Sequence, residues 1–199
     1  GISSNLFEAC NTWFGHKKGG LAIATIGACA GFGSITGSSL ATASTMAEIA
    51  LPEMKKYNYS NALSTGTLAA GGTLGILIPP SIALVIYSIL AEQNITAMFT
   101  AALVPGLLAA LGYIVAINIY VKIFPKSAPT GKQADLASKI ISLKKVWPII
   151  FIFLIVLGGI YFGIFTPTEA AAVGAFLSGI IAWKFQKLNW SSLKDSILK

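Results

Sequence analysis

The chain has 199 residues, of which 55% are hydrophobic and only 11% carry a charge. Long apolar runs without the period-two alternation of barrel strands predict an all-α polytopic membrane protein, because a helix needs about 20 apolar residues to cross a bilayer. The formal net charge is +7, yet all 14 basic residues are lysines placed between apolar segments, so membrane orientation explains them better than binding of nucleic acid.

The chain shows no pattern of catalytic residues. Cys10 and Cys29 belong to no CxxC motif, and His16 stands alone beside two lysines. No Ser/His pair, paired aspartates or metal-ligand cluster falls within the apolar segments. We therefore expect neither an enzyme nor a cofactor. Because the sequence begins at Gly1 without an initiator Met or signal peptide, we expect an internal piece of a longer protein.

Residues 1–18 predict a short amphipathic connector. Apolar side chains recur there at roughly helical spacing, with polar residues between them, which favours a helix lying in the membrane interface. Such a helix could act as a hinge or arm, or it could simply lead into the next segment. The apolar positions are Ile2, Leu6, Phe7, Cys10, Trp13 and Phe14.

Residues 19–52 predict a re-entrant helical hairpin. This apolar stretch is too short for two full crossings, and its centre is rich in glycine and hydroxyl groups. We expect arms over about 20–33 and 40–51. At the tip, the carbonyl end of one arm and the amide end of the other would converge, with hydroxyls to complete a ligand shell. Small residues also pack membrane helices tightly, so packing is the alternative for this tip. The hydroxyls are those of Thr36, Ser38, Ser39 and Thr42.

Residues 61–90 predict a broken transmembrane helix. Pro79 and Pro80 offer no backbone donors, and three glycines loosen the turns before them. Non-helical backbone at membrane depth is tolerated only where protein buries it or it lines a cavity, so the break is a candidate site. The first half-helix would end in carbonyls near 75–78, suited to a cation. The second would begin at Pro79 or Pro80, its amide end suited to an anion.

The rest of the chain predicts further spans. A polar turn, with Thr96 as a helix cap, leads to a transmembrane helix over 97–123. Residues 124–145 predict a lysine-rich aqueous loop, and 146–199 two more helices and a tail. Between those two helices, Thr166 and Glu169 have the spacing of a capping box, with Pro167 in the first helical position. Glu169 as a buried ion ligand is the alternative.

This topology places the lysines on one face of the membrane. If the hairpin opens on that face and the broken helix crosses, every lysine-bearing connection returns to it, and the opposite turns carry no lysine. Excess lysine marks the cytoplasmic side, so the loop 124–145 should be cytoplasmic.

Five motifs follow one another along the chain: Gly19–Ala22, Gly37–Ala43, Pro52–Met54, Gly72–Ser81 and Gly163–Ala170. Any one motif is weak, but the ordered set is specific and covers 19 to about 172. With these motifs the chain resembles the large membrane (M) subunit of the tripartite ATP-independent periplasmic (TRAP) transporters.

The resemblance implies an elevator-type, sodium-coupled importer of small organic acids, such as C4-dicarboxylates or sialic acid, in a prokaryotic inner membrane. It also implies two partners, a small membrane (Q) subunit and a periplasmic substrate-binding (P) protein. Two inverted repeats would each contribute a hairpin and a broken helix, with residues 146–199 opening the second repeat. The second hairpin is missing from this sequence, so half of the site would lie elsewhere.

By matching motif positions, the resemblance also assigns site residues. Those expected in the sodium shell, partly through backbone carbonyls, are Gly37, Ser38, Gly72, Thr73 and Ile78. Those expected to bind the substrate are Ser39, Thr42, Pro80 and Ser81. No metal other than the coupling sodium ion is implied.

Two alternatives stay open. Another ion-coupled carboxylate carrier would share this physics and differ in its partners. A membrane channel or assembly subunit without transport of its own would use the glycines for packing only. Electrogenic uptake that needs both sodium and a binding protein would distinguish a TRAP transporter from these two alternatives.

Overall fold

The computed structural model describes residues 2–130 and 135–185, which contain helices and no strand. The prediction of an all-α protein is confirmed. The helices are α1 (Ile2–Phe14), α2 (Gly20–Thr36), α3 (Ser39–Lys56), α4 (Asn61–Leu77), α5 (Ile82–Leu90), α6 (Ile95–Ile123), the 3-10 turn η1 (Pro125–Ser127), α7 (Leu136–Tyr161) and α8 (Pro167–Phe185).

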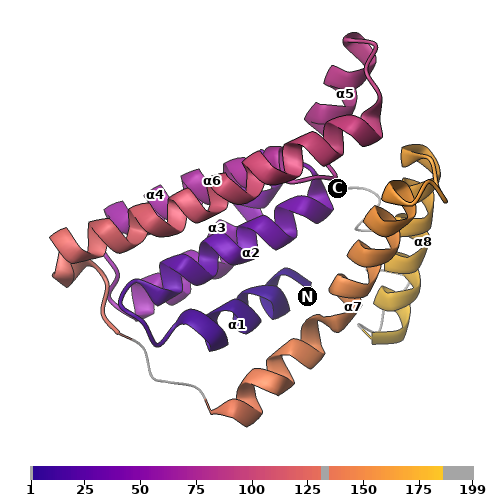
Figure 1. Cartoon of the computed structure of the whole chain (residues 1–199). Coiled ribbons are helices and arrows are strands. Elements are labelled where there is room, and N and C mark those ends of the chain that lie inside the picture. The colour runs from indigo at the N-terminus through magenta and orange to yellow at the C-terminus, as the bar shows by residue number, and fades with distance from the viewer. Residues whose placement is uncertain (1, 131–134, 186–199) are drawn as a thin grey trace. The chain divides into compact units, whose positions relative to one another are not determined.

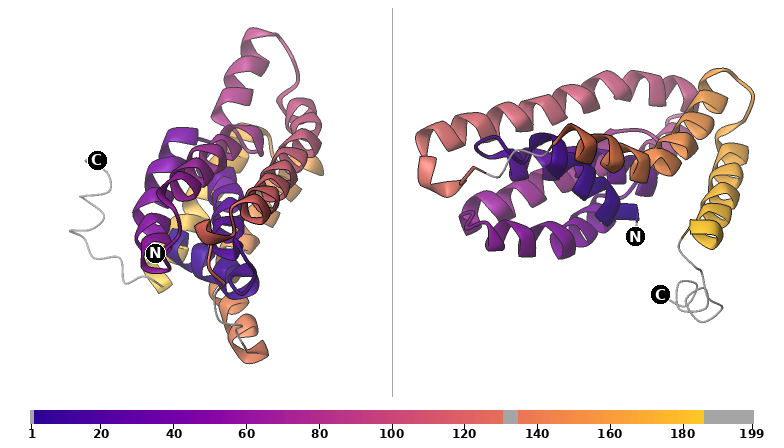
Figure 2. Two further views of the ribbon diagram at one scale, coloured as in Figure 1. Left: turned by 90° about the vertical axis from the view of Figure 1, so that its left-hand side faces the viewer. Right: turned by 90° about the horizontal axis from the view of Figure 1, so that it is seen from below.

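The chain forms two compact units, which we describe separately. The N-terminal unit comprises Ile2–Val146 and holds α1 to α6 with the start of α7. In it, α2 is the central helix, packed against α1, α3 and α4, while α6 lies alongside α4 (Figures 1 and 2). Helix α2 is apolar on all sides because it is surrounded: Leu21, Ile26 and Cys29 are all almost completely buried.

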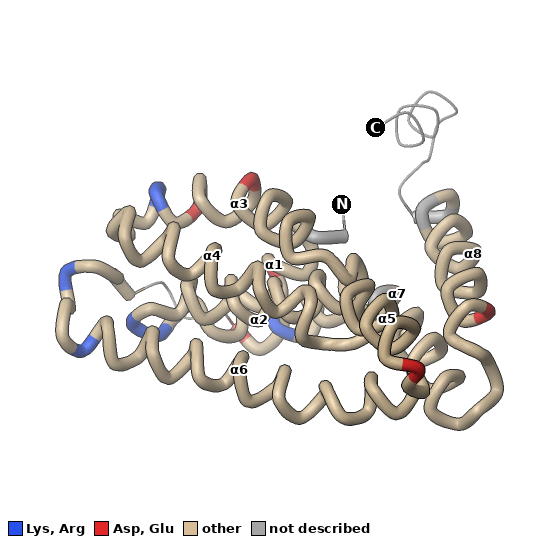
Figure 3. Tube along the Cα trace, turned by 90° about the horizontal axis from the view of Figure 1, so that it is seen from above, with Lys and Arg blue, Asp and Glu red and all other residues tan. Residues whose placement is uncertain are grey.

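One end of the N-terminal unit gathers the start of α2 and α4 and the end of α3 and α6. The backbone N–H of Ser60 donates to the Ser127 carbonyl at 2.9 Å, and the N–H of Leu21 donates to the Tyr59 hydroxyl at 3.2 Å. Burial raises the pKa of that hydroxyl, so it stays neutral. Several lysine segments gather at this end, and we call it the lysine end (Figure 3). The sequence neighbours of its helix ends are Lys17, Lys18, Lys55, Lys56, Lys122 and Lys126.

Length and composition make some of these helices suitable for crossing a membrane. Among the described residues, α6 alone is long and apolar enough by itself, and the number rises to three if each of two bent helix pairs counts as one span. One such pair is α4 and α5, bent by 44°. Most of α6 is exposed in its apolar window, as expected of a surface that faces lipid.

Several predicted boundaries were wrong. Helix α3 runs through Pro52 to Lys56, past the end at 52 predicted for the hairpin, and the turn begins only at Tyr57. Asn94, and not Thr96, caps α6, since its side chain accepts the N–H of Ala97 at 3.0 Å. Helix α7 already begins at Leu136, inside the predicted loop.

In the C-terminal unit, the capping box at the start of α8 is confirmed. Glu169 accepts the backbone N–H of Thr166 at 2.8 Å, and the Thr166 hydroxyl accepts the N–H of Glu169 at 3.3 Å. Glu169 is exposed among the described residues, and its carboxylate is engaged in this capping box. Four lysines assigned above to the cytoplasmic face lie outside the described residues: Lys132, Lys187, Lys194 and Lys199.

Candidate functional site

The tip between α2 and α3 is a two-residue turn. Gly37 ends α2 in the left-handed conformation, with φ of 62°, and its N–H donates to the Gly33 carbonyl at 2.7 Å. Ser38 follows in an extended conformation and caps α3, its hydroxyl accepting the N–H of Ala41 at 3.4 Å. A left-handed residue followed by an extended one reverses the chain within two residues, and glycine adopts the first without strain.

The break between α4 and α5 repeats the same pairing of a carbonyl end with a serine-capped amide end. Pro79 and Pro80 lack the N–H groups that would bond the carbonyls of Gly75 and Ile76. Ser81, only 2% exposed, donates to the Ile76 carbonyl at 2.8 Å and accepts the N–H of Leu84 at 3.4 Å. One hydroxyl therefore joins the last turn of α4 to the first turn of α5.

This capping moves the start of the second half-helix. We predicted that it begins at Pro79 or Pro80, but α5 begins at Ile82. The reason is that Ser81 has the extended backbone of a cap, with φ of −133° and ψ of 127°, close to the −131° and 125° of Ser38.

The hairpin tip and the break meet. The N–H of Ile82 donates to the Gly37 carbonyl at 3.4 Å. A Cβ atom added at Gly37 would lie 3.1 Å from the Ile82 nitrogen and 3.2 Å from the Pro80 carbonyl oxygen. The two non-helical connections therefore touch through their backbones, which only a residue without a side chain permits here.

Glycines bring α4 equally close to the hairpin. A Cβ added at Gly75 would lie 2.7 Å from the Thr42 hydroxyl oxygen and 2.8 Å from the Ser38 carbonyl. One added at Gly72 would lie 2.8 Å from the Ala43 Cβ and 3.3 Å from the Ser39 carbonyl. The end of α4 thus packs directly on the start of α3.

A buried hydroxyl holds the tip together. Thr42 has no exposed surface, and its hydroxyl donates to the Ser38 carbonyl at 2.7 Å. The same oxygen lies 3.0 Å from the Thr36 hydroxyl at the end of α2. Thr42 therefore ties the two arms of the hairpin at the point where they turn.

Four helix ends meet at this place, which we call the junction. The carbonyl ends of α2 and α4 carry partial negative charge and the amide ends of α3 and α5 partial positive charge. Among the described residues, no group of three or more His, Cys, Asp or Glu side chains could hold a metal ion. Any ion held at the junction would rely on carbonyl and hydroxyl oxygens, and an anion on amide groups.

The structure brings together most of the residues assigned from the sequence but not all of their side chains. Gly37, Ser38, Ser39, Thr42, Gly72, Pro80 and Ser81 line the contact between tip, α4 and break. The Thr73 hydroxyl faces away, toward α6, and lies 2.9 Å from the Tyr113 hydroxyl. The Ile78 side chain also faces α6, where it packs against Gly106.

Sequence reasoning overlooked Tyr113, and nothing near it in the sequence pointed to α4. It also overlooked the capping roles of Ser38 and Ser81. That signal was available, because a serine directly before an apolar helical run is a common N-cap.

A broken helix that meets a hairpin tip within an apolar helical unit is an arrangement that recurs in membrane transporters. The chain matches the family model described as the tripartite ATP-independent periplasmic transporter, DctM component, over residues 1–199, and it belongs to that family. The resemblance to the TRAP large membrane subunit is confirmed.

Individual relatives agree. The chain is 41% identical to the C4-dicarboxylate TRAP transporter large permease protein DctM of Pseudomonas aeruginosa, over 92% of the chain and 42% of the relative. It is 43% identical to the protein of the same name from Vibrio cholerae, over 92% of the chain and 40% of the relative. It is 36% identical to the isethionate TRAP transporter permease protein DctMQ of Oleidesulfovibrio alaskensis, over 100% of the chain and 31% of the relative. The chain thus spans less than half the length of these relatives, which are permease components and not enzymes.

Proposed function

We propose that this chain is part of the large permease subunit of a sodium-coupled importer of small organic acids. The names of its relatives support uptake of an organic acid, since they specify C4-dicarboxylate and isethionate. A periplasmic binding protein would deliver the substrate and a small membrane subunit would accompany the permease. The lysine end would face the cytoplasm of a prokaryote.

The observation that carries this proposal is the meeting of four helix ends at the junction. Two carbonyl ends offer oxygens for a sodium ion, and two amide ends offer partial positive charge for a carboxylate. The contact between the Gly37 carbonyl and the N–H of Ile82 places both kinds of end within hydrogen-bond distance of each other. Cation and anion would therefore bind as neighbours.

Neighbouring sites of opposite charge give a simple basis for coupling. A sodium ion at the carbonyl ends would order the hairpin tip and the break, and its charge would favour a carboxylate beside it. Coupling requires that each ligand binds better when the other is present, by about 1–3 kcal/mol, and the effect must be reciprocal. The hairpin-bearing part would then carry both ligands across the membrane as an elevator.

The test is uptake of labelled organic acids into proteoliposomes that contain the full-length permease, its small membrane partner and the cognate binding protein. Ser38→Ala removes a hydroxyl at the junction. Ser44→Ala, on the exposed side of the same helix, is the matched control because its hydroxyl bonds only the Ala41 carbonyl. We expect sodium-driven uptake that needs all components, and a higher sodium requirement in Ser38→Ala alone.

Sodium-independent flux, or equal sodium dependence in both variants, would contradict the proposal. It would assign the glycines of the junction to helix packing.

A further inference from the structure

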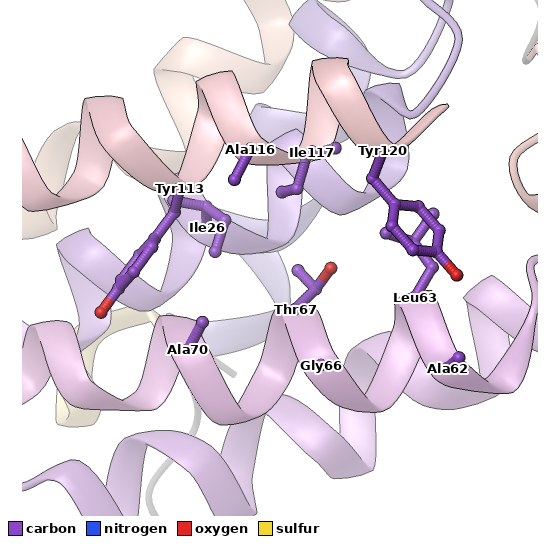
Figure 4. Close-up of a pocket in the computed structure, with 10 residues that line it drawn as sticks. All are labelled: Ile26, Ala62, Leu63, Gly66, Thr67, Ala70, Tyr113, Ala116, Ile117 and Tyr120. Carbon is purple, nitrogen blue, oxygen red and sulfur yellow. The ribbon is translucent and has the colours of Figure 1, made fainter. Parts of the chain in front are cut away.

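A groove runs along the N-terminal unit between α4 and α6, apart from the junction. It has a volume of about 250 Å³ and is lined mainly by apolar side chains. Tyr113 stands toward one end and Tyr120 toward the other, with Thr67 between them on the opposite helix (Figure 4). From α4 the lining includes small residues at every fourth position, Ala62, Gly66 and Ala70, together with Leu63 and Thr67.

Thr67 gives this groove an unmet requirement. Thr67 is only 4% exposed, and its hydroxyl has no hydrogen-bond partner among the described residues. In Figure 4 the hydroxyl points from α4 toward α6, into the groove. A buried hydroxyl without a partner is destabilising, so a ligand that offers an acceptor here would be favoured.

One end of the groove lies toward the lysine end, and we call this end the mouth. Ala62, in the first turn of α4, and Tyr120, in the last turn of α6, are its lining residues nearest that end. At this end the backbone N–H of Ser60, the cap of α4, donates to the carbonyl of Ser127, which follows Lys126 in the sequence. The amide end of α4 and Lys126 therefore give the mouth a positive charge, while the interior of the groove is apolar.

We propose that the groove binds one anionic phospholipid. One acyl chain would lie along the small-residue face of α4, and the headgroup phosphate would sit at the amide end of α4 near Lys126. A carbonyl oxygen of the lipid's ester linkage would accept a hydrogen bond from the Thr67 hydroxyl. An apolar chain combined with a negative headgroup matches both the lining and the charge at the mouth.

The test uses phosphatidylglycerol that carries a photoactivatable diazirine on one acyl chain, added to the full-length permease in nanodiscs, with crosslinked peptides mapped by mass spectrometry. Gly66→Leu should fill the groove, because no atom other than its own helix backbone and chain neighbours lies within 4 Å of a Cβ added there in the described structure. Gly112→Leu is the matched control: its position on α6 is equally open but does not line the groove.

We expect crosslinks to the α4 and α6 peptides that line the groove. Gly66→Leu should reduce them about tenfold, the change in affinity that follows if about two methylene groups of the acyl chain are no longer buried. Gly112→Leu should crosslink like the wild type. Thr67→Val should weaken labelling without unfolding the protein, since the replacement has the same shape. A phosphatidylcholine probe should label less than phosphatidylglycerol, and Lys126→Gln should reduce that preference.

Undiminished labelling in Gly66→Leu, or equal labelling by the two lipids, would overturn the proposal. So would formation, under a mild oxidant, of a disulfide between Gly66→Cys and a second cysteine introduced into another helix of the permease or its partner, with Cys10 and Cys29 replaced by alanine, because that helix would then occupy the groove. None of these measurements depends on transport.

Discussion

At the scale of single residues, Ser81 has the most demanding position. Its buried hydroxyl bonds both half-helices at the break, so we expect Ser81→Ala to lower the free energy of unfolding in detergent by about 1–2 kcal/mol, the usual cost of losing a helix cap. Ser88→Ala is the control: it is equally buried in α5, but its hydroxyl bonds only a carbonyl of its own helix, that of Leu84. Equal losses in the two variants would show that the bridge adds no stability.

Thr73 and Tyr113 form the hydrogen bond between α4 and α6. We expect Thr73→Val and Tyr113→Phe each to cost about 1 kcal/mol of unfolding free energy, and the double variant clearly less than the sum, because the bond between the two hydroxyls is lost in all three. Thr73→Val also loses the bond from its hydroxyl to the Ala70 carbonyl in its own helix. Sodium-driven uptake distinguishes a positioning role from ligation. If the Thr73 hydroxyl only positions α4, both single variants should shift the sodium requirement alike. A shift in Thr73→Val alone would make that hydroxyl a ligand.

At the scale of helices, the glycines of α4 set how closely it approaches the hairpin. A methyl group at Gly75 would overlap the Thr42 hydroxyl and the Ser38 carbonyl, so we expect Gly75→Ala to destabilise by about 1–3 kcal/mol. Gly112→Ala, in open space on α6, should instead stabilise by up to about 1 kcal/mol through helix propensity. Thermal unfolding of the two variants measures this difference, and a neutral Gly75→Ala would mean that α4 is not held against the tip.

How much the sequence predicts also differs between elements. The two prolines end α4 wherever the chain is folded, because their missing N–H groups and fixed φ are covalent properties, and the glycines and hydroxyls of the hairpin tip have local signatures as well. The direction of the Thr73 side chain is different. It depends on which face of α4 meets α6, and Tyr113 lies 40 residues away in the sequence. Composition and spacing contain no information about that contact.

Pro52 is a case in which tertiary packing overrides a local sequence rule. Its local rule predicts a helix end, yet α3 continues to Lys56 because packing of Met54, which is fully buried, holds the last turn in place. Local rules therefore predicted the break at the two adjacent prolines, where packing cannot replace the missing N–H groups. They failed at Pro52, where packing offsets the loss of one helical hydrogen bond.

At the scale of the whole molecule, the direction of insertion can be tested within the N-terminal unit. The lysine end and the turn between α5 and α6 lie at opposite ends of α6, and that turn carries Glu92 but no lysine. Positively charged connections stay in the cytoplasm during insertion, so the turn should face the periplasm. The measurement is labelling of single cysteines by a maleimide that does not cross membranes, after Cys10 and Cys29 have been replaced by alanine.

We expect Gln93→Cys, in the turn between α5 and α6, to be labelled in intact cells, and Lys126→Cys to be labelled only after the membrane is opened. Both positions lie outside the apolar helices, so neither change should disturb packing. The reverse pattern would place the lysine end in the periplasm. Labelling of both positions in intact cells would mean that α6 does not separate them across the bilayer. We expect α6 to separate them, because its 29 residues are mostly apolar and exceed the roughly 20 needed to span.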